Sequence, residues 1–364
     1  MKKINVLVVD DSAFMRKLIS DFLSEDPQIK VIGTARNGED GIKKLKNLKP
    51  DVITMDVEMP VLNGLDALKY IMENHPIPIV MLSSTTNEGT NDTLTAIQNG
   101  AIDFIAKPSG AISLDLHKIK EDLIRKVISA SNVNKKQLIN LSTNQNLTVK
   151  QDESYSKIGL EKSSSLSNKV GKNHHLNKLV CIGTSTGGPR ALQTVLTKLP
   201  ANIDAGILVV QHMPAGFTKS LAVRLNSLCE IRVKEAEDGE VVQKGTAYIA
   251  PGGYHLKIQQ KGNNLAIHLD QSEARNGHRP AVDVMFESIS EVNGYEKVAV
   301  IMTGMGSDGA YGLKTLKKNS DVKAIAESQE TSIVYGMPKA AIETKLIDEI
   351  QDVDNIARSI LKYV

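Results

Sequence analysis

The chain has 364 residues, 41% of them hydrophobic, and its 44 Lys and Arg against 42 Asp and Glu give a formal net charge of +2. This length predicts two domains with a core in each, and the near-neutral charge argues against nucleic-acid binding, which needs a basic surface. Two cysteines and the lack of a long apolar span favour a reduced, cytoplasmic protein that is not embedded in a membrane.

Short apolar runs alternate with amphipathic stretches through the first 130 residues. This alternation predicts a doubly wound α/β domain, in which helices cover both faces of a parallel sheet. The predicted strands are 4–9, 31–35, 52–55, 79–82 and 102–106. The predicted helices are 13–24, 38–48, 65–74, 92–99 and 114–131.

Polar side chains follow these predicted strands at the points where each strand ends. They are Asp10 and Asp11 after the first strand, Asp56 after the third, Ser83 after the fourth and Lys107 after the fifth. Functional groups of parallel sheets collect at the carboxyl ends of the strands, so we expect these side chains to converge. Crowded carboxylates repel one another unless a cation neutralises them, and such oxygen ligands suit Mg²⁺. The set predicts phosphoryl chemistry.

The same segment resembles the receiver domain of bacterial response regulators. Lys107-Pro108 matches the Lys-Pro pair of that family, and Met59-Pro60 matches the turn after its phosphorylated aspartate. The resemblance implies that Asp56 is the phospho-acceptor and that a chemotaxis histidine kinase is the phosphodonor. It also implies a Mg²⁺ site formed by Asp10, Asp11, Asp56 and the carbonyl of Glu58, with Ser83 and Lys107 contacting the phosphoryl group.

A polar segment follows at 131–178, dominated by Asn, Ser, Lys, Gln and Thr. It has too little apolar surface to offset the entropy of ordering, so we predict a flexible linker between a domain at 1–130 and a domain at 179–364. The pair His174-His175 could suggest a metal site. No other ligand stands at suitable spacing, which favours solvated histidines.

The remainder, 179–364, repeats the α/β alternation and predicts a second doubly wound parallel sheet. Its predicted strands are 179–182, 207–210, 247–250, 298–302 and 322–326. Residues 254–270 alternate around Lys261-Gly262-Asn263-Asn264, a pattern typical of an inserted β-hairpin.

Ser185 stands in a turn between the first of these strands and a predicted helix. Residues 183–187 read Gly-Thr-Ser-Thr-Gly, and Pro189 fits the first turn of a helix. In a G-x-S-x-G turn the glycines permit a sharp bend that presents the serine hydroxyl at the end of a sheet. A Gly-rich loop that cradles phosphate is the alternative interpretation of this stretch alone.

A base and a carboxylate follow later strands: His212 comes directly after 207–210, and Asp308 lies in the Gly-rich stretch after 298–302. In such a set the imidazole takes the proton of the serine hydroxyl and the carboxylate orients the imidazole, which activates the hydroxyl as a nucleophile. His255 and His278 are alternative bases and Asp283 is an alternative acid. The order serine, histidine, aspartate differs from that of α/β-hydrolases, so the triad would be convergent.

Five motifs of this region resemble the chemotaxis-type protein-glutamate methylesterases. They are GTSTGGP at 183–189, QHMP at 211–214, APGG at 250–253, HRP at 278–280 and TGMGSDG at 303–309. The resemblance implies hydrolysis of glutamate methyl esters on chemoreceptor helices, deamidation of receptor glutamines, and no cofactor in this domain. It implies catalysis by Ser185, His212 and Asp308, with the backbone amides of Thr186 and Met305 as oxyanion donors.

Finding both domains in one chain suggests regulation by phosphorylation. We hypothesise that the unphosphorylated receiver obstructs the Ser185 cleft and that phosphorylation of Asp56 weakens this docking. Two other functions compete with this interpretation. One is a response regulator with a non-catalytic protein-binding output domain. The other is a dinucleotide site at the 183–188 turn, which lacks the G-x-G-x-x-G spacing.

Overall fold

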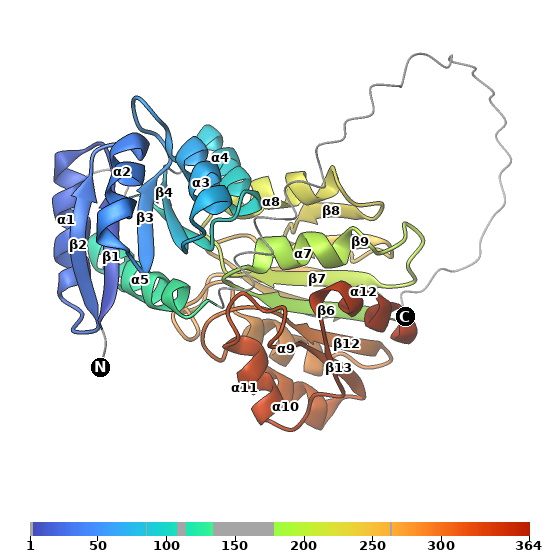
Figure 1. Ribbon diagram of the computed structural model, residues 1–364. Coiled ribbons are helices and arrows are strands. Elements are labelled where there is room, and N and C mark those ends of the chain that lie inside the picture. The colour runs from blue at the N-terminus through green and yellow to red at the C-terminus, as the bar shows by residue number, and fades with distance from the viewer. Residues whose placement is uncertain (1–2, 85, 108–113, 134–177, 263) are drawn as a thin grey trace, which may run out of the picture.

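The computed structural model describes residues 3–84, 86–107, 114–133, 178–262 and 264–364. Figure 1 shows two layered α/β units side by side, with the amino terminus on the first and the carboxyl terminus on the second. Residues 134–177, and with them most of the predicted linker at 131–178, lie outside the described residues.

The first unit holds a five-stranded sheet in the order β2-β1-β3-β4-β5, with every pair parallel. Its strands are β1 (Ile4–Val9), β2 (Ile29–Ala35), β3 (Val52–Asp56), β4 (Ile79–Ser83) and β5 (Asp103–Ala106). Its helices are α1 (Ala13–Ser24), α2 (Gly38–Leu48), α3 (Gly64–Asn74), α4 (Asn87–Gln98) and α5 (Leu114–Ser131). This is the doubly wound sheet that the alternating pattern predicts.

The first helices of this unit are capped at their amino ends by side chains that accept hydrogen bonds from free backbone amides. The hydroxyl of Ser12 accepts from the amide of Met15, and the side chain of Asn37 accepts from that of Asp40. The predicted start of α4 at residue 92 is wrong, because Thr86 caps the helix through the amide of Gly89 and α4 starts at Asn87. The first turns of α4 are polar, so they carry no apolar period that the sequence could reveal.

The second unit holds a seven-stranded parallel sheet in the order β14-β13-β12-β6-β7-β9-β8. Its strands are β6 (Lys178–Thr184), β7 (Gly206–Gln211), β8 (Arg232–Glu235), β9 (Thr246–Ile249), β12 (Glu296–Ile301), β13 (Val322–Glu327) and β14 (Glu349–Gln351). Its helices are α7 (Gly188–Leu196), α8 (Phe217–Asn226), α9 (Val282–Ser290), α10 (Ala310–Asn319), α11 (Met337–Glu343) and α12 (Val353–Tyr363). Sequence analysis missed β8 and β14, which are short edge strands rich in charged and polar residues.

The predicted hairpin is present as β10 (His255–Lys261) and β11 (Asn264–Asp270), which pair antiparallel from His255 opposite Asp270. A hydrogen bond joins this hairpin to α9, in which the hydroxyl of Ser288 accepts from the amide of Ile258 at 2.7 Å. Two parallel α/β sheets, the second with an added hairpin, confirm the predicted fold class.

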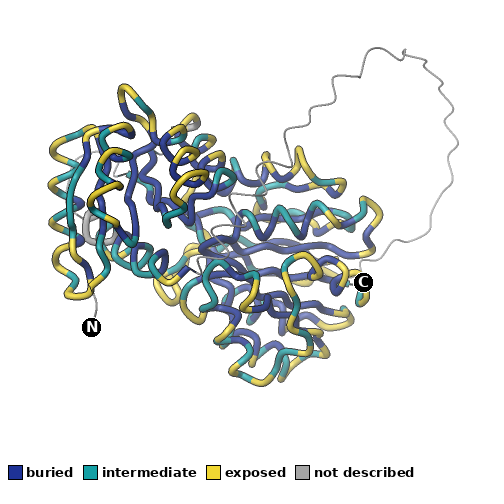
Figure 2. Tube along the Cα trace, viewed as in Figure 1, coloured by how far each residue is buried: buried dark blue, intermediate teal, exposed yellow. Residues whose placement is uncertain are grey.

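The two units share one apolar core. Phe104 of β5 and Phe217 of α8 are both buried, and their ring centroids lie 4.5 Å apart. Helix α4 packs against α7 and α8 at the same boundary. Figure 2 shows that the strands of both sheets are buried while the outer turns of the helices are exposed. Within the described ranges, no helix combines the length and apolar character that crossing a bilayer requires.

Candidate active site

The carboxyl edge of the first sheet gathers the acidic residues that the sequence singled out. Oxygen atoms of Asp10, Asp11 and Asp56 all lie within 4.8 Å of one another. The ammonium of Lys107 lies 2.6 Å from Oδ2 of Asp56 and 3.5 Å from Oδ2 of Asp10. The predicted convergence of three carboxylates and a lysine is therefore found.

This pocket suits a divalent cation with oxygen ligands. Burial raises the pKa of Asp56 to about 6 and also raises the pKa of Asp10, because Lys107 offsets only part of the desolvation. Oδ2 of Asp10 is buried with no hydrogen-bond partner in the described part of the chain. A cluster of carboxylates that retains spare oxygen lone pairs is typical of a Mg²⁺ site.

The other predicted residues of this pocket lie around it. The buried hydroxyl of Ser83 donates to the carbonyl of Gly89 at 2.8 Å, so in this structure it is engaged by α4. The amide of Glu58 donates to Oδ1 of Asp56 at 3.3 Å. Ser83 thus stands at the neighbouring strand end with its hydroxyl directed to α4 rather than to the carboxylate of Asp56.

Ser185 lies in the tight turn between β6 and α7. Its amide donates to the carbonyl of Thr303 at 3.0 Å, and the residue is buried, with 8% of its surface exposed. Gly187 completes the turn with φ of 79°, and a Cβ there would lie 2.7 Å from Cβ of Ile333. A Cβ on Gly188 would lie 1.9 Å from Oε1 of Gln211, so protein atoms fill the space that a phosphate-cradling loop would leave open.

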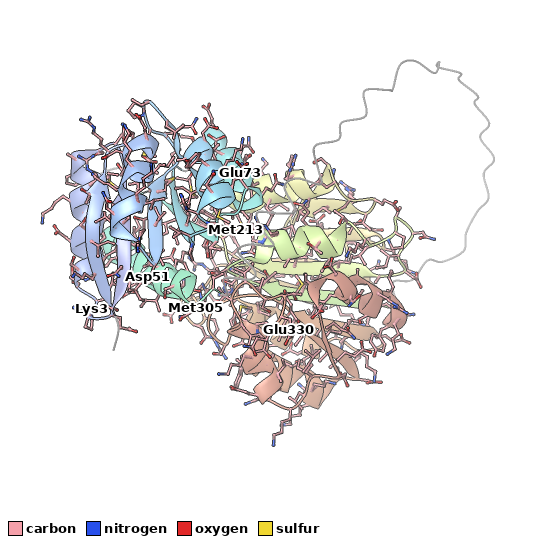
Figure 3. All side chains as sticks on the ribbon, viewed as in Figure 1. Lys3, Asp51, Glu73, Met213, Met305 and Glu330 are labelled. Atoms are coloured by element: carbon pink, nitrogen blue, oxygen red, sulfur yellow. The ribbon has the colours of Figure 1, made fainter. Side chains whose placement is uncertain are left out.

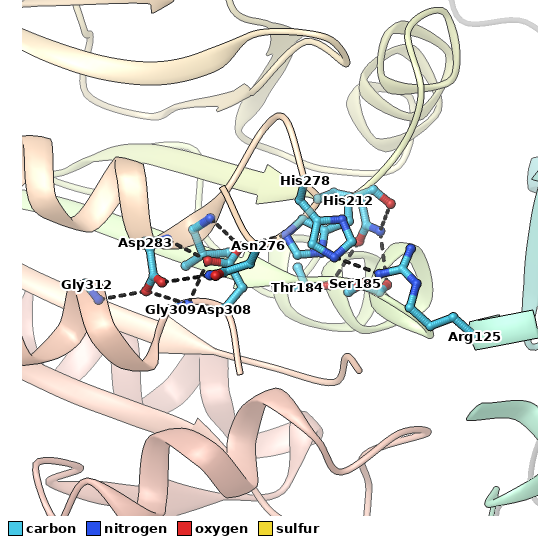
Figure 4. Close-up of polar contacts among 12 residues, drawn as sticks. Arg125, Thr184, Ser185, His212, Asn276, His278, Asp283, Asp308, Gly309 and Gly312 are labelled. Atoms are coloured by element: carbon cyan, nitrogen blue, oxygen red, sulfur yellow. Dashed lines mark hydrogen bonds and ion pairs between the residues drawn. The ribbon is translucent and has the colours of Figure 1, made fainter. Parts of the chain in front are cut away.

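His212 follows β7, the strand that pairs with the Ser185 strand. Its Nε2 lies 2.8 Å from Oδ2 of Asp308, and both side chains are buried. Its other ring nitrogen, Nδ1, is buried with no partner among the described residues. Figure 4 shows Asp308, His212 and Ser185 in that order along the site. Asp308 therefore occupies Nε2, and Nδ1 is the ring nitrogen without a partner; among the described residues no hydrogen bond joins it to the Ser185 hydroxyl.

Asp308 is held by backbone amides as well as by the imidazole. Oδ2 accepts from the amide of Val282 at 2.7 Å, and Oδ1 accepts from the amide of Asp283 at 3.0 Å. Burial alone would raise its pKa, but the hydrogen bonds from His212 and these amides hold the pKa of Asp308 below its usual value. The carboxylate stays ionised and can fix the imidazole with a proton on Nε2.

The alternative acid and one alternative base are engaged elsewhere. Oδ1 of Asp283 accepts from the amides of Gly309 and Gly312 at 2.9 and 2.7 Å, and so serves the start of α10. His255 is fully buried in β10 with Nε2 3.0 Å from the carbonyl of Glu273. Neither side chain is paired with His212 in the way that Asp308 is.

His278 does reach the site, although not as a partner of Asp308. Its ring stacks on that of His212 with centroids 3.8 Å apart and planes at 11°. Burial, together with His212 and Arg125, lowers the pKa of His278 to about 3, so the ring is neutral. Arg125 of α5 donates to Nε2 of His278 at 2.7 Å. Figure 4 shows Arg125 reaching into the site from the first unit.

Sequence analysis missed the contacts that the first unit makes with this site. The hydroxyl of Thr186 donates to the carboxylate of Asp103, which begins β5. Arg190 of α7 donates to the carbonyls of Ile97 and Gln98 at the end of α4. Figure 3 shows Met213 and Met305 at the edge of the second unit that faces the first. Nothing in the spacing of Asp103 or Arg125 marks them, because such contacts depend on how the units dock.

The pair His174-His175, which the sequence left as a weak metal candidate, lies outside the described residues. The two backbone donors predicted for an oxyanion belong to residues of the Ser185 region: Thr186 follows the serine, and Met305 lies in the 303–309 stretch that contacts it. The amide of Ser185 bonds to Thr303, and a Cβ on Gly304 would lie 2.8 Å from Cβ of Ser185.

Two family descriptions match the chain: "Response regulator receiver domain" over residues 6–117 and "CheB methylesterase" over residues 180–360. The protein-glutamate methylesterase/protein-glutamine glutaminase of Geobacillus kaustophilus is 54% identical over 364 residues, covering 100% of this chain and 99% of that protein. The enzyme of the same description from Bacillus subtilis is 52% identical over 366 residues, covering 99% and 98%. The crystal structure of the Thermotoga maritima CheB methylesterase catalytic domain is 46% identical, with a TM-score of 0.50, and covers 52% of this chain and 99% of that one.

Proposed function

This chain belongs to the protein-glutamate methylesterase/protein-glutamine glutaminase family, and from that membership we propose that Ser185, His212 and Asp308 hydrolyse glutamate methyl esters on chemoreceptors. The protein then acts in chemotaxis adaptation, on the cytoplasmic helices of receptors. The observation that carries the assignment is the 2.8 Å contact between His212 Nε2 and Asp308 Oδ2, at the end of the strand that pairs with the Ser185 strand. A binding-only output domain would have no use for this pairing.

The proposed reaction is acyl transfer through a covalent intermediate. Nδ1 of His212 takes the proton from the Ser185 hydroxyl as Oγ bonds to the side-chain carbonyl carbon of the glutamate ester. The backbone amides of Thr186 and Met305 stabilise the oxyanion. The imidazolium gives its proton to the methoxy oxygen, and methanol leaves. Water, deprotonated by the same imidazole, then cleaves the acyl-enzyme and releases glutamate and free Ser185.

Deamidation of a glutamine uses the same groups with a different leaving group. The imidazolium protonates the amide nitrogen, ammonia departs, and the resulting acyl-enzyme is the one formed from the ester. The triad acts on the acyl carbon in both cases, so we propose that one site serves both activities. This part of the chain supplies nucleophile, base and oxyanion donors from its own residues, and we propose that it needs no cofactor.

We propose that the first unit is the receiver and that Asp56 accepts the phosphoryl group from a chemotaxis histidine kinase. Mg²⁺ would be held by Asp10, Asp11, Asp56 and the carbonyl of Glu58, and would neutralise the phosphoryl oxygens. Lys107 would pair with the phosphoryl group. Ser83 would leave the carbonyl of Gly89 and bond to a phosphoryl oxygen instead.

We further propose the division into receiver 1–130, linker 131–178 and catalytic domain 179–364. It is supported by the family matches at 6–117 and 180–360. In this division the receiver contacts residues next to the proposed triad, through Asp103 to Thr186 and Arg125 to His278. These contacts support inhibition by the unphosphorylated receiver, because they place Asp103 and Arg125 against the neighbours of Ser185 and His212, where a receptor helix would have to bind.

Methanol release from a methylated receptor, measured with and without a small phosphodonor and Mg²⁺, tests the whole proposal. We expect slow release without the donor and faster release with it. A protein that takes up phosphate on Asp56 yet releases no methanol above the uncatalysed rate would refute the esterase assignment.

A further inference from the structure

Thr303 joins the two halves of the Ser185 site. Its carbonyl accepts from the amide of Ser185 at 3.0 Å, and its hydroxyl donates to the carbonyl of Thr186 at 2.9 Å. The same hydroxyl accepts from the amide of Val334 at 3.0 Å. Thr303 therefore lies within one hydrogen bond of the nucleophile and of one oxyanion donor, and two residues before the other donor, Met305.

The remaining polar group of Thr303, its amide, is held by Glu327. This residue ends β13, is 1% exposed, and accepts the Thr303 amide on Oε2 at 2.7 Å. The hydroxyl of Thr331 donates to its other oxygen, Oε1, at 3.0 Å. No cation pairs with Glu327 within the described ranges, and Asp352 is the charged group that acts on it.

A carboxyl buried without a cation is costly to a fold, and an apolar side chain would fill β13 more cheaply. Glu327 does serve one local need, because the amide of Thr303 would otherwise be a buried donor without an acceptor. Its side chain holds the amide of Thr303 through this hydrogen bond. Burial raises its pKa to about 7, and the hydrogen bonds from Thr303 and Thr331 offset only part of this effect.

We infer that Glu327 is a positioning residue for catalysis. By holding the amide of Thr303 it fixes the backbone conformation of residues 303–305, and thereby the direction of the Met305 amide and the position of the Ser185 turn. The inference rests on the proposed roles of Ser185, Thr186 and Met305. An oxyanion exists only in the transition state, so misplacing its donors lowers kcat and leaves KM nearly unchanged.

The test compares two replacements of similar size in the full chain. Glu327→Gln keeps an acceptor for Thr303 and can donate to Thr331, whereas Glu327→Met fills the space without an acceptor. We expect Glu327→Met to lose kcat roughly 10- to 100-fold, and Glu327→Gln to stay within about threefold of the parent protein. Methanol release from methylated receptor, with phosphodonor and Mg²⁺, gives kcat and KM.

Glu349→Gln is the matched control, because this carboxylate lies on the neighbouring strand β14 and bonds to Lys362, away from residues 303–305. It should leave kcat unchanged. If Glu327→Met does not fold, Glu327→Asp takes its place, since it draws the carboxylate back by about 1.5 Å and should also lower kcat.

Wild-type kcat in Glu327→Met, or in Glu327→Asp where Met does not fold, would overturn the inference. Equal losses in Gln and Met would do the same, because the acceptor would then be irrelevant. Ser185→Ala, run in parallel, tests the proposed function separately from the role of Glu327. If it remains active the proposed function is wrong, whereas an inactive Ser185→Ala beside a fully active Glu327→Met refutes only the role of Glu327.

Discussion

Arg125 of the receiver donates to Nε2 of His278 at 2.7 Å, and the ring of His278 stacks on the ring of His212. Nε2 of His278 can accept this bond because the ring is neutral. A residue of the regulatory unit is therefore one ring away from the proposed catalytic base.

Removing this contact should loosen the docked receiver. We expect Arg125→Ala to raise methanol release without a phosphodonor several-fold, and Arg125→Ala with Asp103→Ala to raise it further. Deleting residues before the linker should give the largest increase. Arg36→Ala, an exposed change on the receiver, is the control and should alter nothing. An isolated catalytic domain no faster than the unphosphorylated chain would rule out inhibition by obstruction.

Ser185→Ala should nearly abolish hydrolysis while the receiver still takes up phosphate on Asp56. Loss of a triad nucleophile costs on the order of a millionfold in turnover. Methanol release and phosphate incorporation, measured on the same sample, check both halves of this expectation. Undiminished release would remove Ser185 from the mechanism.

His212→Ala should be nearly as severe as Ser185→Ala, because its imidazole is the group paired with Asp308. His255→Ala is the histidine control, since that ring bonds to the carbonyl of Glu273 and not to the triad. A larger loss of turnover in His255→Ala or His278→Ala than in His212→Ala would show that we have assigned the wrong base.

Stimulation should depend on Asp56 and on the cation. Asp56→Asn should keep basal methanol release and lose the response to a phosphodonor, and removing Mg²⁺ with a chelator should mimic it in the parent protein. Asp66→Asn, at the start of α3, is a matched acidic control that should still respond. Stimulation that survives both treatments would place the phospho-acceptor elsewhere.

Stability should depend on pH through Glu327. Its pKa of about 7 lies above the value of 4.5 for an unfolded chain, so the native state binds the proton more tightly. Stability from this group is present below pH 4.5 and is lost as the pH rises through 7. Relative to Glu327→Gln, the parent protein should lose about 2 to 3 kcal/mol of unfolding free energy between pH 5 and 8. Urea unfolding of both proteins at both pH values measures this difference. A difference in unfolding free energy between the parent protein and Glu327→Gln that is the same at pH 5 and pH 8 would contradict the prediction.

Local sequence was enough to predict most of the fold and several of the side chains that meet at each strand edge. Apolar runs such as Val6 to Val9 are buried on both faces, and strand ends in a parallel sheet meet at one edge, which is why Asp10, Asp56 and Lys107 could be grouped. The pairing of His212 with Asp308 followed from the same reasoning.

What could not be predicted depends on packing across elements or between domains. Strands β8 and β14 contain no apolar run from which they could be predicted. The contacts of Asp103 and Arg125 with the catalytic unit leave no pattern in the spacing of residues along the sequence. Glu327 sits at the end of an apolar strand, where a carboxylate suggests a solvated strand end. Only the folded chain reveals that the loop of a neighbouring strand covers it.

The shared core at Phe104 and Phe217 gives the regulatory step a temperature dependence. If the receiver inhibits by docking, as proposed, its release would separate these rings and hydrate apolar surface, a change with a positive heat capacity. The free energy that stabilises the docked receiver then depends non-linearly on temperature and passes through a maximum. Cooling below that maximum weakens the apolar contact, so the basal methanol release of the unphosphorylated enzyme should increase in the cold as well as in the heat, relative to that of the isolated catalytic domain.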